Sequence, residues 1–310
     1  MTSALRFLLA GLICMAPATL RADEAPAHPL KPMLWKVEGG KLSKPSYLFG
    51  TVHLGSGPLA NLHPAVEKAF SGADVVYTEI PMDAKSQLEG TMKTVRKDGR
   101  KLSESIGADL TKQLDAELGR INPQLDSTPF QQLKTWVAAV SLEVIESQMK
   151  GETAMDQKLW QRAEKEGRKT GAIETLDSQL AVFDSFKEEE QIVFLAESLR
   201  IAREDREAGK DSTQELVDVY VKGDADLLKK EMDRQMETIA KGEHKELGER
   251  LMKKVLTDRD KTMAATMVEI LGKSPGETHF FAAGAAHFAG PASIRSHIEK
   301  QGYTVTRVEN

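Results

Sequence analysis

The sequence predicts an α/β protein with a mainly parallel or mixed central sheet and a large helical insertion. Short apolar runs typical of buried strands lie near both ends of the 310-residue chain, and long stretches with apolar residues at every third or fourth position separate them. Strands and helices alternate at both ends, which favours parallel pairing. The chain has no linker rich in Pro, Gly or Ser, so we expect residues 33–310 to form one domain.

The segment before this domain predicts export. Residues 1–22 contain Arg6, then an apolar stretch and small residues up to Ala22, which is the layout of a secretory signal peptide. We expect cleavage near Ala22, a periplasmic or secreted protein, and disorder over residues 23–32. Cys14 is the only cysteine of the chain, so the mature protein would contain no disulfide.

Charge and hydropathy exclude two classes of partner. The formal net charge of the full chain is −5, and removal of the two arginines of the signal segment would make the mature chain more acidic, which argues against nucleic acid. No later segment is long and apolar enough for a membrane span, so we expect no stable membrane insertion.

Six segments have the composition of strands. The first two flank a turn at residues 38–41 and predict a β-hairpin. The segments are 34–37, 46–49, 74–80, 170–174, 279–283 and 303–308.

The chain between these segments predicts helices. Apolar residues recur at three-to-four-residue spacing, with charged residues between them, in 128–149, 153–167, 187–209 and 244–272. We therefore expect a helical insertion around residues 83–150 and 185–272.

Polar side chains follow four of the predicted strands. The pattern Gly-x-x-His occurs twice, ending at His53 and at His287, and Glu79 and Glu174 end two further apolar runs. Sites in open α/β sheets are built at the carboxyl ends of strands, so these side chains are expected to converge. Imidazole and carboxylate groups bind Zn, Fe, Co or Mn. A single histidine after a strand is more often structural, but two histidines with two acids predict a divalent metal site.

Arg259 stands out because it lies in the apolar stripe of the predicted helix 244–272. An arginine on a buried face needs an acidic or anionic partner. It would either pair with a structural carboxylate or reach the site and hold a substrate carboxylate or oxyanion. Asp156 gives a similar but weaker signal, and an exposed or capping role is expected there.

Taken in order, these residues resemble the TraB/PrgY/GumN family. Residues 44–55 look like its opening signature, and the later features are Glu79, Met155-Asp156, Glu174-Thr175 with Gln179, Arg259, and the element from Gly284 to Gly290. The resemblance covers about residues 33–308. The chain departs from the family pattern at Ile173, where leucine is usual, and at Asp260, which replaces the asparagine of an Arg-Asn pair.

The resemblance implies both a fold and an activity. The fold would be similar to that of erythromycin esterase and the ChaN haem-binding proteins, with an α/β core and a helical insertion. The Tiki branch of the family is described as metal-dependent proteases that use paired Gly-x-x-His motifs and a glutamate, which here would be His53, His287 and Glu79.

We therefore expect hydrolysis of a peptide or similar amide bond in a peptide or protein substrate by a metal-activated water. His53 and His287 would bind the metal as neutral imidazoles. Either Glu79 or Glu174 would complete the coordination, and the other would accept the proton of the water. Arg259 would then stabilise charge on the carbonyl oxygen.

Two other classes stay open. One is a non-catalytic periplasmic protein of the same fold that binds a peptide or haem, with a histidine as axial ligand. The other is a structural relative whose histidines only brace the strand ends. The length of the chain permits a homodimer without requiring one.

Overall fold

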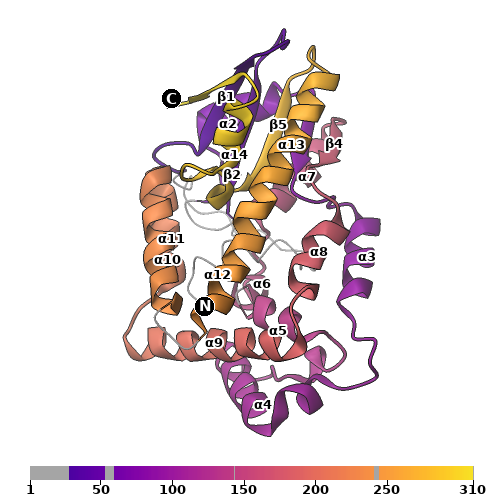
Figure 1. Ribbon diagram of the computed structural model, residues 1–310, viewed down its shortest axis with the longest axis vertical. Helices are drawn as coiled ribbons and strands as arrows, with labels where there is room; N and C mark the ends of the chain where they lie inside the picture. Colours follow the sequence, from indigo (N-terminus) through magenta and orange to yellow (C-terminus); the bar gives the residue numbers. More distant parts are fainter. Residues whose placement is uncertain (1–27, 53–58, 143, 241–243, 310) are drawn as a thin grey trace.

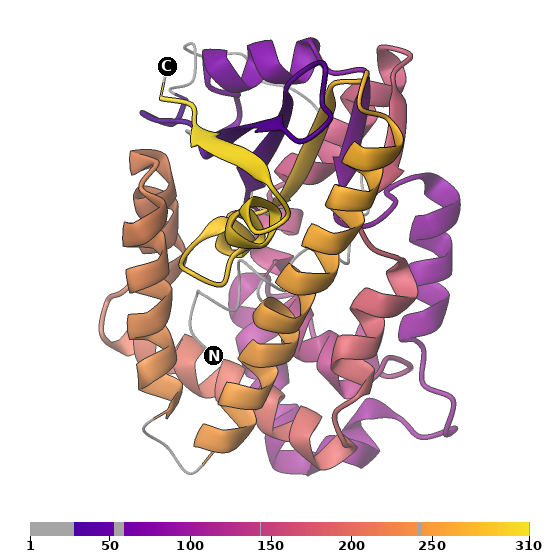
Figure 2. The same ribbon diagram turned by 45° about the horizontal axis from the view of Figure 1, so that its top comes forward.

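The computed structural model describes residues 28–52, 59–142, 144–240 and 244–309. The predicted signal peptide, residues 23–27 of the segment 23–32, and His53 lie outside these residues. Figure 1 shows a sheet at one end of the molecule and a group of helices, which includes α4, α5 and α9, at the other. Helix α13 runs from this group up alongside the sheet, as Figure 2 also shows.

The sheet has six strands in the order β4-β3-β5-β2-β1-β6. Strands β2, β5, β3 and β4 run parallel, whereas β1 is antiparallel to both β2 and β6. The strands are β1 (Leu34–Gly39), β2 (Ser46–Thr51), β3 (Val75–Thr78), β4 (Lys169–Ala172), β5 (His279–Gly284) and β6 (Tyr303–Arg307). The mixed sheet, the hairpin of β1 and β2, and all six predicted strand positions are confirmed.

The helices fill the long intervals before and after β4. The α-helices are α2 (Pro64–Ser71), α3 (Ala84–Thr94), α4 (Leu102–Ile121), α5 (Thr135–Ser141), α6 (Ile145–Met149), α7 (Met155–Lys165), α8 (Leu176–Asp184), α9 (Glu188–Glu207), α10 (Ser212–Lys222), α11 (Ala225–Ala240), α12 (Lys245–Met252), α13 (Asp258–Lys273) and α14 (Ile294–Glu299). The described residues also form the short 3-10 helices η3 (Thr128–Phe130) and η5 (Ala285–Phe288).

Two predicted helices differ from their expected form. The segment 128–149, for which the apolar spacing predicts helical structure, is helical but is divided into η3, α5 and α6. Pro129 is tolerated in the first turn of η3, and the helix is broken after it, where Leu133 pairs with Val95 in an isolated antiparallel bridge before α5 begins. The predicted helix 244–272 is interrupted by a π segment, η4 (Lys253–Thr257), in which the N–H of Asp258 donates to the carbonyl oxygen of Lys253.

The core is built around β5, the strand with every residue buried. Both faces of a mainly parallel sheet are covered, so its central strands are continuously apolar. Phe280 packs against Phe49 of the neighbouring strand and against Phe70 of α2, with ring centroids 5.6 and 5.4 Å apart. Among the residues whose placement is described, no helix combines the length and the apolarity needed to cross a bilayer.

Gly50 allows β2 to approach the turn that carries His287. A Cβ atom at Gly50 would lie 3.0 Å from Cα of Ala285 and 3.2 Å from Cβ of Met33. We expect Gly50→Ala to lower the free energy of unfolding by about 1–3 kcal/mol because the added methyl group overpacks this contact. Gly272→Ala is the matched control, since a Cβ there meets nothing within 4 Å. It should raise stability by about 0.4–1 kcal/mol. Urea denaturation measures both, and equal effects of the two changes would contradict the close approach.

Candidate active site

The candidate site lies where the parallel strands β3, β4 and β5 end. Glu79 directly follows β3, Glu174 comes two residues after β4, and His287 lies in η5 directly after β5. The backbone extends the pairing of β3 and β4, because the N–H of Glu174 donates to the carbonyl oxygen of Glu79 at 2.7 Å. Since β3 lies between β4 and β5, Glu79 follows the middle strand, and Glu174 and His287 follow the strands on either side of it.

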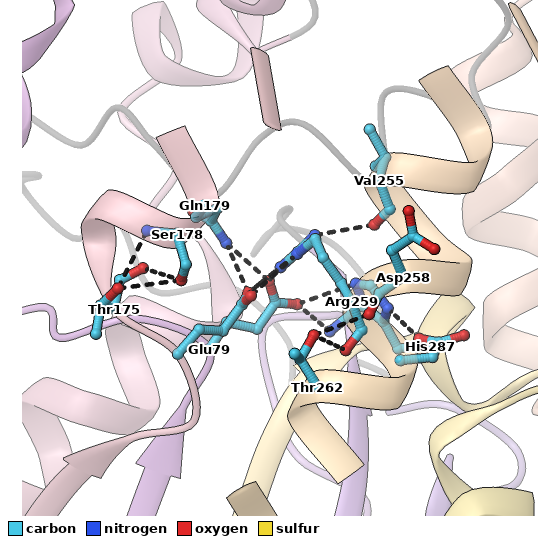
Figure 3. Close-up of polar contacts among 12 residues, drawn as sticks. Glu79, Thr175, Ser178, Gln179, Val255, Asp258, Arg259, Thr262 and His287 are labelled. Atoms are coloured by element: carbon cyan, nitrogen blue, oxygen red, sulfur yellow. Dashed lines mark hydrogen bonds and ion pairs between the residues drawn. The ribbon is translucent and has the colours of Figure 1, made fainter. Parts of the chain in front are cut away.

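Arg259 of α13 binds both glutamates. Its Nη2 atom lies 2.5 Å from Oε2 of Glu79 and also contacts Oε1 of Glu174, to which Nε donates at 3.0 Å. Its Nη1 atom donates to the carbonyl oxygen of Val255, which belongs to the π segment (Figure 3). Arg259 is only 6% exposed. Burial by itself lowers the pKa of Arg259, but the two carboxylates outweigh it and raise this pKa, so the group stays charged.

Glu79 is the centre of the cluster. Its Oε1 atom accepts the N–H of Gly284 at 2.7 Å, and its Oε2 atom accepts Nε2 of Gln179 at 3.1 Å. The same Oε1 atom lies 3.8 Å from Nε2 of His287. Strand β5 therefore supplies both a backbone donor that holds this carboxylate and the turn that carries the histidine facing it.

Asp260 holds the other nitrogen of His287. The Nδ1 atom of His287 lies 2.6 Å from Oδ1 of Asp260, and the exposed fractions of the two residues are 1% and 5%. Burial raises the pKa of Asp260, and the neighbouring His287 opposes this shift. In the sequence, Asp260 stands out only as a departure from the family pattern, and its contact with His287 was not predicted. The acidic residue in place of the usual asparagine, directly after Arg259, was the sequence feature that could have pointed to this contact.

Gln179 contributes a buried acceptor without a partner. Its Nε2 atom donates to Glu79 and lies 3.5 Å from Oε1 of Glu174, which fixes the orientation of the amide group. Its Oε1 atom is buried and has no hydrogen-bond partner within the described part of the chain. Such atoms are rare in native proteins, and an ordered water or a ligand is the usual explanation.

The described residues fit part of a metal site. Within the described ranges, no group of three or more His, Cys, Asp or Glu side chains is arranged to hold a metal ion. His287 Nε2 and Glu79 Oε1 are two atoms of a type that binds metal ions. Nδ1 of His287 contacts the carboxylate of Asp260, and a carboxylate is a common partner for the second nitrogen of a metal-binding histidine. Convergence of His53 with this pair stays a prediction.

The charges of the cluster also favour a cation. Glu79, Glu174 and Asp260 contribute three carboxylates against the one guanidinium of Arg259, which leaves an excess of negative charge when His287 is neutral. Buried charges are costly unless they are paired, so a bound divalent cation would offset this excess.

Asp156 does not have the role expected from the sequence. The expectation of an exposed or capping residue is wrong, because Asp156 is 1% exposed and accepts a 2.6 Å hydrogen bond from the hydroxyl group of Thr51, the last residue of β2. Tyr220 donates a 2.7 Å hydrogen bond to the carbonyl oxygen of Gly50 in the same strand. The end of β2 is thus held by two buried polar contacts.

The fold and the cluster together define an α/β protein with a buried centre of acids and a histidine at the carboxyl ends of its parallel strands. The model of the TraB/PrgY/gumN family matches residues 33–307. The chain belongs to this family, which confirms the resemblance drawn from its motifs.

Curated relatives are similar to the chain over almost its whole length. The "Metalloprotease TIKI1" of Xenopus tropicalis is 24% identical over 96% of this chain and 67% of its own length. The "Metalloprotease TIKI homolog" of Nematostella vectensis is 23% identical over 93% of this chain and 69% of its own length. The chain thus spans about two thirds of these relatives. No solved structure matches it significantly.

Proposed function

We propose that the protein is a metal-dependent hydrolase that cleaves peptide bonds. The observation that carries this proposal is the approach of Glu79 Oε1 to Nε2 of His287 within a buried, negatively charged cluster. The names of the relatives, which are metalloproteases, support the same activity.

The contacts of the two glutamates suggest different roles for them. Glu79 faces His287, so we assign it to the metal together with His287 and, as the sequence predicts, His53. Glu174 makes its side-chain contacts with Arg259 and Gln179, and we assign it as the base that takes a proton from the attacking water and passes it to the leaving amine. A bound divalent ion would supply a Lewis acid that activates water and polarises the carbonyl group.

Arg259 has a different role in this proposal from the one expected from the sequence. Its Nε and Nη2 atoms donate hydrogen bonds to the two glutamates, and Nη1 donates to the carbonyl oxygen of Val255. We infer that Arg259 holds both carboxylates in position and compensates their charge, rather than binding the carbonyl oxygen of the substrate.

Metal content and metal-dependent cleavage test the function directly. We expect about one divalent ion per chain, loss of peptide cleavage after chelation, and recovery with one of Mn, Co, Zn or Fe. His287→Ala and His53→Ala should lose both metal and cleavage because they remove proposed ligands. Elemental analysis and mass spectrometry of a peptide library measure these quantities.

His244→Ala, at the start of α12, where the side chain makes no capping hydrogen bond, is the matched control and should retain both properties. A folded wild-type protein that binds none of the four metals would refute the proposal. Metal or haem binding without any cleavage would favour the non-catalytic binding protein.

A further inference from the structure

The side chain of Asp260 fixes which nitrogen of His287 carries hydrogen. An ionised carboxylate only accepts hydrogen bonds, so the 2.6 Å contact requires a hydrogen on Nδ1 of His287. In a neutral ring, Nε2 then carries a lone pair, and this atom faces Glu79 Oε1 at 3.8 Å. The opposite tautomer would place two lone pairs against each other in a buried contact.

The two residues that carry this contact cannot easily rearrange. His287 is 1% exposed and lies in the short turn after β5, and Asp260 lies in the first turn of α13 directly after Arg259. Arg259 is tied to both glutamates, so the start of α13 is anchored to β3 and β4 while Asp260 extends to the turn after β5. The position of the ring is therefore set by the packing of α13.

We propose that Asp260 is a positioning residue that holds His287 in the Nδ1–H tautomer and directs the lone pair of Nε2 toward a divalent cation between His287 and Glu79. The part that concerns the cation rests on the proposed function, whereas the tautomer does not.

The charge of Asp260 adds to the effect of its geometry. An asparagine, which the family pattern has at this position, would accept the same hydrogen bond through its Oδ1 atom but would carry no charge. A carboxylate raises the basicity of the imidazole, and loss of such a partner typically weakens metal binding by about 10–100-fold. The chain would therefore hold its metal more tightly than an asparagine-containing variant of itself.

Three variants separate geometry from charge. Asp260→Asn keeps the acceptor and removes the charge, and Asp260→Leu removes both. The matched control is Asp258→Asn, in the same helical turn, where the carboxylate pairs with exposed Lys253 instead of the site.

The tautomer is measured first, in metal-free protein. Long-range ¹⁵N–¹H spectra of the histidine rings, with the signal of His287 assigned by its loss in His287→Ala, should show Nδ1–H in the wild type and in Asp260→Asn. Asp260→Leu should lose this preference. An Nε2–H ring in the wild type, or an unchanged ring in a folded Asp260→Leu, would overturn the inference.

The affinity for the metal is measured second, by calorimetry with the ion that the wild type binds. Asp260→Asn should bind it about 10–100-fold more weakly, with Asp258→Asn unchanged. Equal affinity in Asp260→Asn would overturn the role of the charge. If the wild type binds no metal, the proposed function and the cation part of this inference both fail, while the spectra still decide the tautomer.

Discussion

Replacing Arg259 with methionine is expected to lower the free energy of unfolding by about 3–5 kcal/mol at pH 7. The reason is that Glu79 and Glu174, both buried, would lose the guanidinium group that they share. A buried charge without its partner costs far more than an exposed one. Urea denaturation of the metal-free protein measures the change.

The pH dependence of this variant gives a second test. Without Arg259, two buried carboxylates would lie close together with no cation to compensate them, so their charged forms would cost more in the folded protein than in the unfolded chain. Stability that depends on a raised pKa is present at low pH and is lost as the pH rises. The difference between variant and wild type should therefore shrink between pH 7 and pH 5, because protonation removes the uncompensated charge.

Two further changes control for this result. Arg203→Met removes an exposed arginine whose pair with Glu207 spans 4.0 Å, and it should change the free energy of unfolding by less than about 1 kcal/mol. Arg259→Lys keeps the charge but not the fork of donors, so an intermediate loss is expected. A loss at Arg259→Met no larger than that of Arg203→Met would contradict the assigned role of the cluster.

Glutamine substitutions should separate the two glutamates. We expect Glu79→Gln to lose the bound metal and with it most of the activity, a fall of at least about 10³-fold in kcat/KM. Glu174→Gln should keep the metal but lower kcat by about 10²–10⁴-fold, since it removes the proposed base. Elemental analysis and steady-state kinetics on one peptide measure both effects.

The matched control for this pair is Glu117→Gln. Glu117 is also buried and paired with arginines, but it lies in α4 within the helical insertion. The Glu117→Gln variant should therefore leave the metal content and kcat unchanged. Loss of the metal in Glu174→Gln with its retention in Glu79→Gln would show that the two roles are exchanged. If neither substitution changed the metal content or kcat, neither glutamate would take part in the mechanism.

The strands and the chemical character of the site could be predicted because they are local properties of the sequence. Apolar runs such as His279–Gly284 have the composition of buried strands, and the polar residue that ends each run is visible at once. The order of the strands is not visible in this way. Only the placement of β3 between β4 and β5 shows that Glu79 lies between Glu174 and His287.

Two parts of the site depend on how distant segments pack and could not be predicted. Asp260 lies in the first turn of a helix, where an acidic residue is ordinary, and only the packing of α13 against η5 brings it to His287. Asp156 has the same appearance in the sequence, yet its partner Thr51 is 105 residues away. Such pairings carry no periodic signal.

The π segment before Arg259 can be understood as a shift of phase between two helices. A turn closed from residue 253 to residue 258 holds one residue more than an α-helical turn, so it rotates everything after it by roughly 100° relative to a continuous α-helix. That rotation decides that Arg259 and Asp260, as well as Met263 and Met267, face inward. The rotational position of Arg259 and Asp260 is thus set by a single additional residue in a helix, outside the strands that lead to Glu79 and Glu174.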